Sequence, residues 1–175
     1  MKDHFEQLAA YNRWANARLY QAAFGLEDAE YRRDVGSFFG SLHGTLNHLL
    51  VTDRLWMKRF TGEGDALDRL DAILYDDLTD LASARADEDD RITNYINGLD
   101  AAALSARMTY ANTSGQEFEE QRSALLTHLF NHQTHHRGQA HTILSICGAA
   151  PPSLDLLVLQ RGVAAPDLRS LAKGA

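Results

Sequence analysis

Residues 123–147, SALLTHLFNHQTHHRGQAHTILSIC, decide what kind of fold this chain forms. Leu125 and Leu129 recur at the spacing of one face of a helix. Ser123 is suited to cap the start of that helix, and Gly148 is suited to end it. The stretch therefore predicts one long helix. It also carries an unusual density of imidazoles, at His128, His132, His135, His136 and His141.

Length and composition are those of an ordinary globular domain. The chain has 175 residues, enough for one domain with a real core. Its formal net charge is −7, so we expect neither nucleic acid nor an anionic membrane surface as a partner. No apolar run could span a bilayer and the N-terminus is too charged for a signal peptide, so a cytoplasmic location is expected. Cys147 is the only cysteine, which excludes an internal disulfide and favours a small buried side chain.

Three further segments show helical periodicity, and with the histidine-rich stretch they predict an all-α four-helix bundle. We expect these helices over about residues 3–24, 37–60 and 68–96. All three prolines lie after residue 150, which permits long helices before it. Residues 1–160 are expected to form a single domain, and residues 161–175 a C-terminal tail with a frayed end.

Two segments depart from a simple helical pattern. Residues 106–120, ARMTYANTSGQEFEE, alternate in polarity around a Ser-Gly turn. They predict a small irregular excursion or β-hairpin, and a long crossover into the last helix. Residues 84–91, ARADEDDR, are so polar that we expect this part of the third helix to face solvent.

A helical wheel separates the histidines of the last helix. At about 100° per residue, His132 and His136 fall on the apolar face, about 40° apart. His128 and His135 lie on its flank, and His141 points to the opposite side. Two imidazoles on a buried face must each find a hydrogen-bond partner, and a shared metal ion removes that cost for both. We therefore favour a metal site at His132 and His136 over histidines that only pack.

A third ligand must come from another helix, and the second helix offers His43 and His48. We interpret Asn47, Arg54 and Lys58 as its solvent-facing stripe. His43 lies about 40° from the centre of that stripe, whereas His48 lies about 100° from it, toward the buried side. His48 is the better candidate.

The pattern excludes several common sites. Gln133 stands where an HExxH zinc protease carries its glutamate base. A di-iron carboxylate bundle needs Glu-x-x-His pairs, which the sequence lacks. Three histidines without a carboxylate suit Zn²⁺ or Ni²⁺, and they leave at least one position open to water or substrate. The sequence also has no P-loop, no GxGxxG and no GxSxG.

Several of these stretches resemble the DinB/YfiT-like superfamily, the DinB family of damage-inducible proteins. They are YNRWANARL at 11–19, LNHLLVTDRLW at 46–56, FNHQTHHRGQAHTIL at 130–144 and PPSLDL at 151–156. The resemblance covers about residues 3–160.

The resemblance implies a four-helix bundle, often dimeric, with a divalent metal held by three histidines. By their place in the motifs, the ligands are His48, His132 and His136, which the helical wheels also select. Relatives include proteins classed as metal-dependent hydrolases, and S-transferases and an isomerase that use thiols such as bacillithiol or mycothiol. A small-molecule substrate is therefore expected, with a low-molecular-weight thiol as a candidate cofactor.

Three hypotheses stay open: an enzyme, a non-catalytic metal-binding stress-response protein, and a metal-free bundle whose histidines only pack. Asp53 could orient a ligand or take a proton, but a salt-bridge carboxylate is favoured. Gln139 and His135 are candidates to contact the ligands, and His128 could be a hydrogen-bond partner or an alternative ligand. Arg137 could instead bridge helices.

Extra aromatic surface on the first helix suits a homodimer, although core packing explains it equally well. The residues concerned are Tyr11, Trp14, Tyr20 and Phe24.

Overall fold

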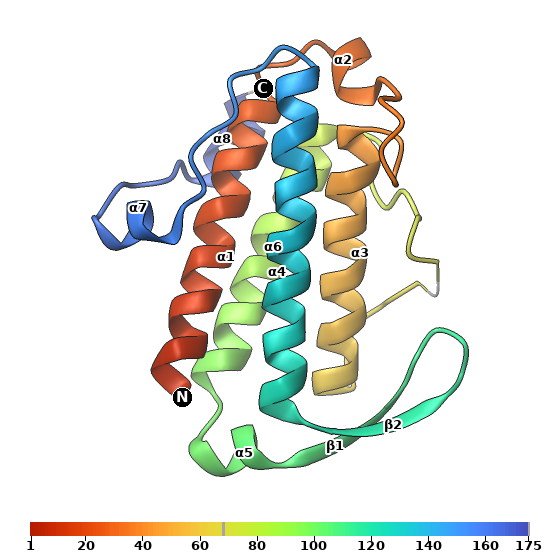
Figure 1. The fold of residues 1–175 in the computed structure, drawn as a ribbon, viewed down its shortest axis with the longest axis vertical. Coiled ribbons are helices and arrows are strands. Elements are labelled where there is room, and N and C mark those ends of the chain that lie inside the picture. Colours follow the sequence, from red (N-terminus) through yellow and green to blue (C-terminus); the bar gives the residue numbers. More distant parts are fainter. Residues whose placement is uncertain (68, 175) are drawn as a thin grey trace.

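The structure is a computed structural model that describes residues 1–67 and 69–174, and it shows a helical bundle with one small hairpin (Figure 1). In Figure 1, α6 crosses the front, α1 and α3 flank it, and α4 lies behind. The predicted all-α four-helix bundle is thus confirmed. The long helices are α1 (Lys2–Ala23), α3 (Leu42–Thr61), α4 (Leu78–Asn97) and α6 (Arg122–Ile146).

Short elements connect the long helices. The predicted hairpin is present before the last helix, with antiparallel strands that place Tyr110 opposite Phe118. Ser123 does not cap α6, because the helix begins at Arg122 directly after the second strand. The short elements are α2 (Asp28–Arg32), α5 (Ala101–Ser105), β1 (Arg107–Ala111), β2 (Glu117–Gln121), α7 (Leu156–Gln160) and α8 (Leu168–Gly174).

The third long helix begins later than its apolar spacing predicts. Its expected start near Asp68 lies outside the described residues, and residues 69–77 form a loop rather than helix. Gly62, at φ 76°, ends α3. The side chain of Asp77 then caps α4 by accepting hydrogen bonds from the backbone N–H groups of Thr79 and Asp80. The apolar residues between Gly62 and Asp77 therefore lie in a loop and can pack against α3.

The core consists of two apolar clusters with a layer of buried polar side chains where they meet. One cluster includes Leu46 and Leu144, and the other includes Met57 and Leu126. We call the buried side chains between them the polar layer. Its members are Asn12 and Asn16 of α1, Asp53 of α3, Arg85 and Asp89 of α4, and Gln133 and Arg137 of α6.

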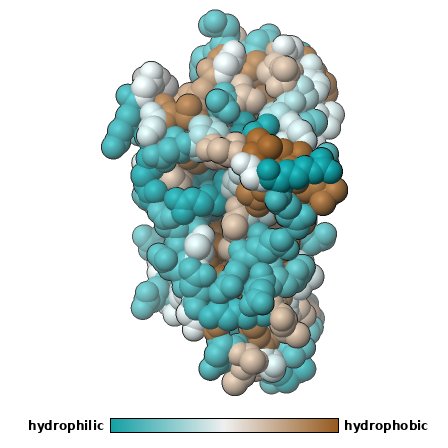
Figure 2. All heavy atoms as spheres, turned by 90° about the vertical axis from the view of Figure 1, so that its left-hand side faces the viewer, coloured by the Kyte–Doolittle hydropathy of each residue, from teal (hydrophilic) through white to brown (hydrophobic). Residues whose placement is uncertain are grey.

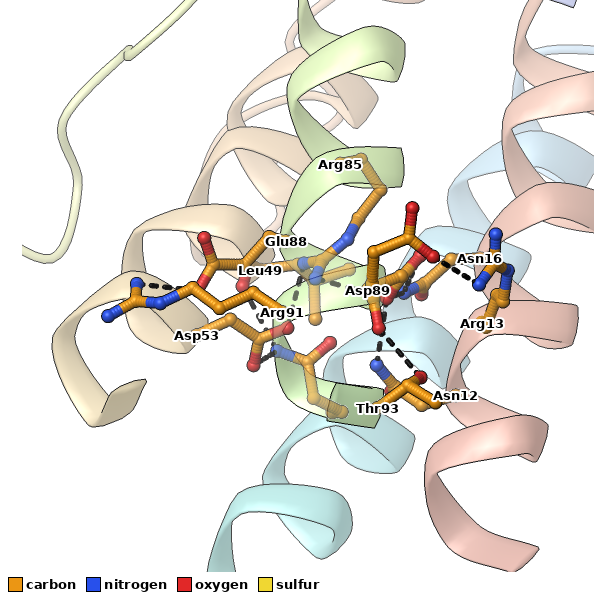
Figure 3. A network of polar contacts seen from close by, with 12 residues as sticks. Asn12, Arg13, Asn16, Leu49, Asp53, Arg85, Glu88, Asp89, Arg91 and Thr93 are labelled. Atoms are coloured by element: carbon orange, nitrogen blue, oxygen red, sulfur yellow. Dashed lines mark hydrogen bonds and ion pairs between the residues drawn. The ribbon is translucent and has the colours of Figure 1, made fainter. Parts of the chain in front are cut away.

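The polar layer contradicts the prediction that residues 84–91 face solvent. Arg85 is fully buried and forms ion pairs with Asp53 at 2.7 Å and with Asp89 at 3.1 Å (Figure 3). Asp89 also accepts hydrogen bonds from the side-chain amides of Asn12 and Asn16. The charges were interpreted as a solvated face because sequence polarity does not reveal that opposite charges meet across helices.

The C-terminal segment packs along α1 and α4. The indole of Trp14 donates a hydrogen bond to the carbonyl of Val163, and Leu168 of α8 is buried. Trp14 and Tyr20, two of the aromatic residues that suggested a dimer, are therefore buried within the chain. Residues 168–174 are helical rather than frayed, and Ala175 lies outside the described residues.

The helix α7 projects from the side of the bundle (Figure 1), and none of its residues is buried. Figure 2, in which this side faces the viewer, shows hydrophobic residues gathered on an otherwise mostly hydrophilic face. Within the residues that the structure describes, no helix has the length and apolarity needed to cross a membrane.

Candidate metal centre

Three histidines converge between α3 and α6. His48 is buried on α3, while His132 and His136 are half-buried one turn apart on α6. Their ring centroids are 4.3 to 5.3 Å apart, and one ligand nitrogen from each ring lies within 4.8 Å of the other two. This group could hold one metal ion.

Two of the imidazoles are oriented by hydrogen bonds on the nitrogen that faces away from the group. His48 Nδ1 donates to the carbonyl oxygen of Leu70 at 2.7 Å, and His136 Nδ1 donates to Gln139 Oε1 at 2.7 Å. Because both partners are acceptors, each Nδ1 carries the hydrogen and each Nε2 keeps its lone pair. Metal-binding histidines usually have this arrangement.

Nitrogen atoms without partners test whether the group fits an ion. His48 Nε2 and His132 Nδ1 are buried and make no hydrogen bond to any described residue. A buried polar atom without a partner costs about 1–3 kcal/mol, which a metal bond would remove. The donor set of three imidazoles fits Zn²⁺ or Ni²⁺.

The surroundings keep these rings neutral. Burial, more than any other cause, lowers the pKa of His48 to about 4 and that of His132 to about 3. Burial also lowers the pKa of His136, against the opposing effect of its hydrogen bond to Gln139. Neutral imidazole is the form that binds metals.

The other predicted histidines lie outside this group. His43 is buried and contacts the carbonyl of Tyr75 through Nε2 at 3.2 Å. His128 and His135 are exposed on either side of the three rings, with centroids 5.9 Å from His132 and 4.8 Å from His136. Neither is among the residues whose ligand atoms converge.

Asp53 belongs to the polar layer, as its salt-bridge interpretation predicts. One carboxylate oxygen pairs with Arg85, and the other accepts a hydrogen bond from Gln133 Nε2. Arg137 bridges helices, since its guanidinium donates to the side chain of Asn12 on α1. Gln133 and Arg137 each follow a histidine of the group directly, so the polar layer lies beside it.

The structure brings His48, and not His43, close to His132 and His136, but part of the reasoning for this choice was wrong. Asn47 is fully buried and does not mark a solvent stripe. Its Oδ1 accepts hydrogen bonds from the backbone N–H groups of Leu74 and Tyr75. An asparagine on an amphipathic helix was interpreted as exposed, whereas here it holds the loop that precedes α4.

Sequence reasoning missed two residues that contact the group. Phe39 stacks on the ring of His48 with a centroid distance of 3.8 Å and meets His136 edge-on at 5.5 Å. Leu70 supplies the carbonyl that orients His48. The helix expected over residues 37–60 includes Phe39, whereas α3 begins only at Leu42 and Phe39 lies in the loop before it.

Replacement of Gln139 by leucine is expected to weaken metal binding by about tenfold to hundredfold, because His136 loses the acceptor that fixes its ring. Competition with a chromogenic chelator measures this affinity. Gln21→Leu, the same substitution at an exposed position of α1, is the matched control. Equal affinity in Gln139→Leu and the control would contradict the orienting role.

The metal-free protein is expected to lose stability as the pH falls from about 6.5 to about 4. The unfolded chain protonates its histidines near their ordinary pKa, while native His48 and His132 resist until about 4 and about 3. At these histidines the unfolded state therefore binds more protons in this window, and acid favours it. Asp53, whose pKa burial raises to about 7, has the opposite sign and offsets part of the effect. Denaturant unfolding in the presence of a chelator measures the effect, and His132→Phe should make the slope shallower. An unchanged slope in that variant would contradict the prediction.

The fold and the convergent rings define a class: helical-bundle proteins with a three-histidine group that could hold a metal ion. The chain matches the DinB family over residues 1–167 and belongs to that family. The resemblance noted in the sequence is thereby confirmed.

Two relatives illustrate the likeness. The chain is 27% identical to Protein DinB of Bacillus subtilis over 165 residues, which cover 89% of this chain and 92% of the relative. It also resembles the crystal structure of a DinB-like protein from Bacillus cereus, with a TM-score of 0.62 and 14% identity over 80% of this chain and 90% of that chain. The second likeness shows the shared fold alone.

Proposed function

We propose that this protein is a metal-dependent enzyme for small molecules, with Zn²⁺ or Ni²⁺ held by His48, His132 and His136. The observation that carries the proposal is that the two nitrogens of a ring have different surroundings. His48 and His136 have their outer nitrogens fixed by Leu70 and Gln139, while the inner nitrogen of His48 is buried without a partner.

The donor set supports catalysis rather than a purely structural site. Structural zinc sites are usually closed by four protein ligands, whereas the described residues bring only three together here. When bound, the ion supplies a Lewis acid that lowers the pKa of a water or thiol in its open position. The reaction is accordingly hydrolysis, or transfer of a low-molecular-weight thiol to an electrophile.

The residues of the chain have defined parts in this proposal. Leu70 and Gln139 hold the imidazoles in the tautomer that binds metal. Phe39 covers the ring of His48 and excludes water from that side. Asp53 pairs with Arg85 and accepts a hydrogen bond from Gln133, so its part in this proposal is to hold α3, α4 and α6 together beside the site.

The rival proposal is a non-catalytic metal-binding stress-response protein. It predicts a site that no substrate can approach. Against it, Phe39 and Leu70, which both contact His48, also line a cavity of about 640 Å³. That volume suits a small molecule.

Activity measurements distinguish the two proposals. Tag-free protein is loaded with Zn²⁺ or Ni²⁺ and offered electrophiles together with water, cysteine, bacillithiol or mycothiol, and loss of thiol or release of acid is followed. We expect turnover with at least one nucleophile, and its loss on chelation. Stoichiometric metal with no turnover across the panel would support the non-catalytic protein. A homodimer remains part of the proposal, and light scattering after size-exclusion chromatography measures it.

A further inference from the structure

A cavity of about 640 Å³ lies between two loops, and two of its lining residues, Phe39 and Leu70, contact His48. Phe38 and Phe39 form one wall, above Gly44 of α3, and Leu70, Asp71 and Ile73 form the other. Cavities of several hundred cubic ångströms bind small organic molecules rather than single ions or water.

Both walls of the cavity continue into the candidate metal centre. Phe39 stacks on His48 at 3.8 Å and meets His136 at 5.5 Å. On the other wall, the carbonyl of Leu70 accepts the hydrogen bond from His48 at 2.7 Å. A molecule in the cavity would therefore lie against residues that contact two of the three rings.

The position of Phe39 depends on a close backbone approach. A Cβ atom on Gly44 would lie 2.2 Å from the carbonyl oxygen of Phe39, so only glycine lets the loop pack this closely on α3. Gly40, at φ 74°, makes the turn that follows. The wall is thus a packed feature of the fold and not a loose loop.

The cavity is apolar, and its apolar side chains face water. Phe38 is 86% exposed, Ile73 49% and Leu70 39%. Among the described residues of the lining, Asp71 alone carries a charge, and it pairs with Arg69 at 3.0 Å. Covering such side chains with an apolar group removes their surface from water, which favours binding.

We propose that the substrate carries an aromatic or branched aliphatic group that occupies this cavity while its reacting end lies at the three histidines. This inference rests on the proposed metal-dependent function. The inference concerns selectivity among substrates. The apolar group of the substrate, and not a charged tail, determines its affinity for the protein.

The test uses the full chain loaded with Co²⁺, whose coordination by a thiolate gives a charge-transfer absorption band. Ethyl mercaptan and phenethyl mercaptan are titrated separately. They share an aliphatic thiol and differ by a phenyl group. We expect phenethyl mercaptan to bind at least about tenfold more tightly.

Substitutions locate the source of that preference. Ile73→Ser and Phe38→Ala should each reduce the preference to about threefold or less, with the affinity for ethyl mercaptan unchanged. Ile146→Ser is the matched control, because Ile146 does not line the cavity and is 51% exposed, whereas Ile73 is 49% exposed. The control should keep the full preference.

The outcomes separate this inference from the proposed function. Failure to bind Co²⁺ in stoichiometric amounts overturns the metal site itself. Stoichiometric Co²⁺ with equal affinity for both thiols, with no band from either, or with a preference that survives both cavity substitutions overturns the inference about the cavity alone.

Discussion

Alanine in place of His132 is expected to weaken metal binding by at least about 100-fold, so that tag-free protein no longer keeps about one ion per chain through purification. Its ring is one of the three that converge, with its centroid 4.3 Å from that of His136 and 5.3 Å from that of His48. The two rings that remain cannot complete a three-ligand site. Elemental analysis of metal per chain, with chelator competition for the affinity, measures the loss.

Exposed histidines of the same helix are the matched controls for His132→Ala. His128→Ala and His135→Ala should keep the metal, since neither ring belongs to the convergent group. Zn²⁺ should also raise the melting temperature of the parent and both controls, because a free ion at about 1,000 times its Kd adds about 4 kcal/mol to the free energy of unfolding. Undiminished metal in His132→Ala would refute the assignment.

Methionine in place of Arg85 is expected to lower the free energy of unfolding by about 3–5 kcal/mol. Arg85 is fully buried, and it is the cation that pairs with both Asp53 and Asp89. Its removal leaves two buried carboxylates without their cation. Urea unfolding followed by circular dichroism measures the change.

A second substitution makes the cause testable. Adding Asp53→Asn to Arg85→Met removes one of the stranded charges and should restore at least about 1 kcal/mol. Arg107→Met is the control, because Arg107 pairs with Glu119 at 3.3 Å on the exposed hairpin, and such pairs contribute about 0–1 kcal/mol. If Arg85→Met destabilised the protein no more than Arg107→Met, the polar layer would not depend on charge.

Periodicity and residue chemistry were enough to predict the bundle, the hairpin and the three rings that converge. The spacing of His132 and His136 places both on one helix face whatever the rest of the fold does. His48 could be chosen because only two histidines were available on the second helix. These features depend on local geometry, which the sequence contains directly.

Two sets of contacts between distant segments were not predicted: those of the loop before α4, and those of the polar layer. Leu70 and Ile73 have helical spacing, yet Gly62 ends one helix, Asp77 starts the next, and the loop between them lies over His48. Arg85 and Asp89 have the polarity of an exposed helix face, yet their partners are on α3 and α1. The sequence of one segment does not reveal which side chains of another segment will pack against it.

The polar layer has a consequence for how the protein can vary. Gln133 on α6 donates to the carbonyl of Leu49 on α3, one residue away from His48. A shift of either helix along its axis by one turn would break this hydrogen bond and leave charged side chains unpaired in the apolar core. The polar layer therefore fixes the position of the two helices relative to each other along their axes. Substitutions in either apolar cluster can therefore accumulate while the distance between His48 and the histidines of α6 stays constant.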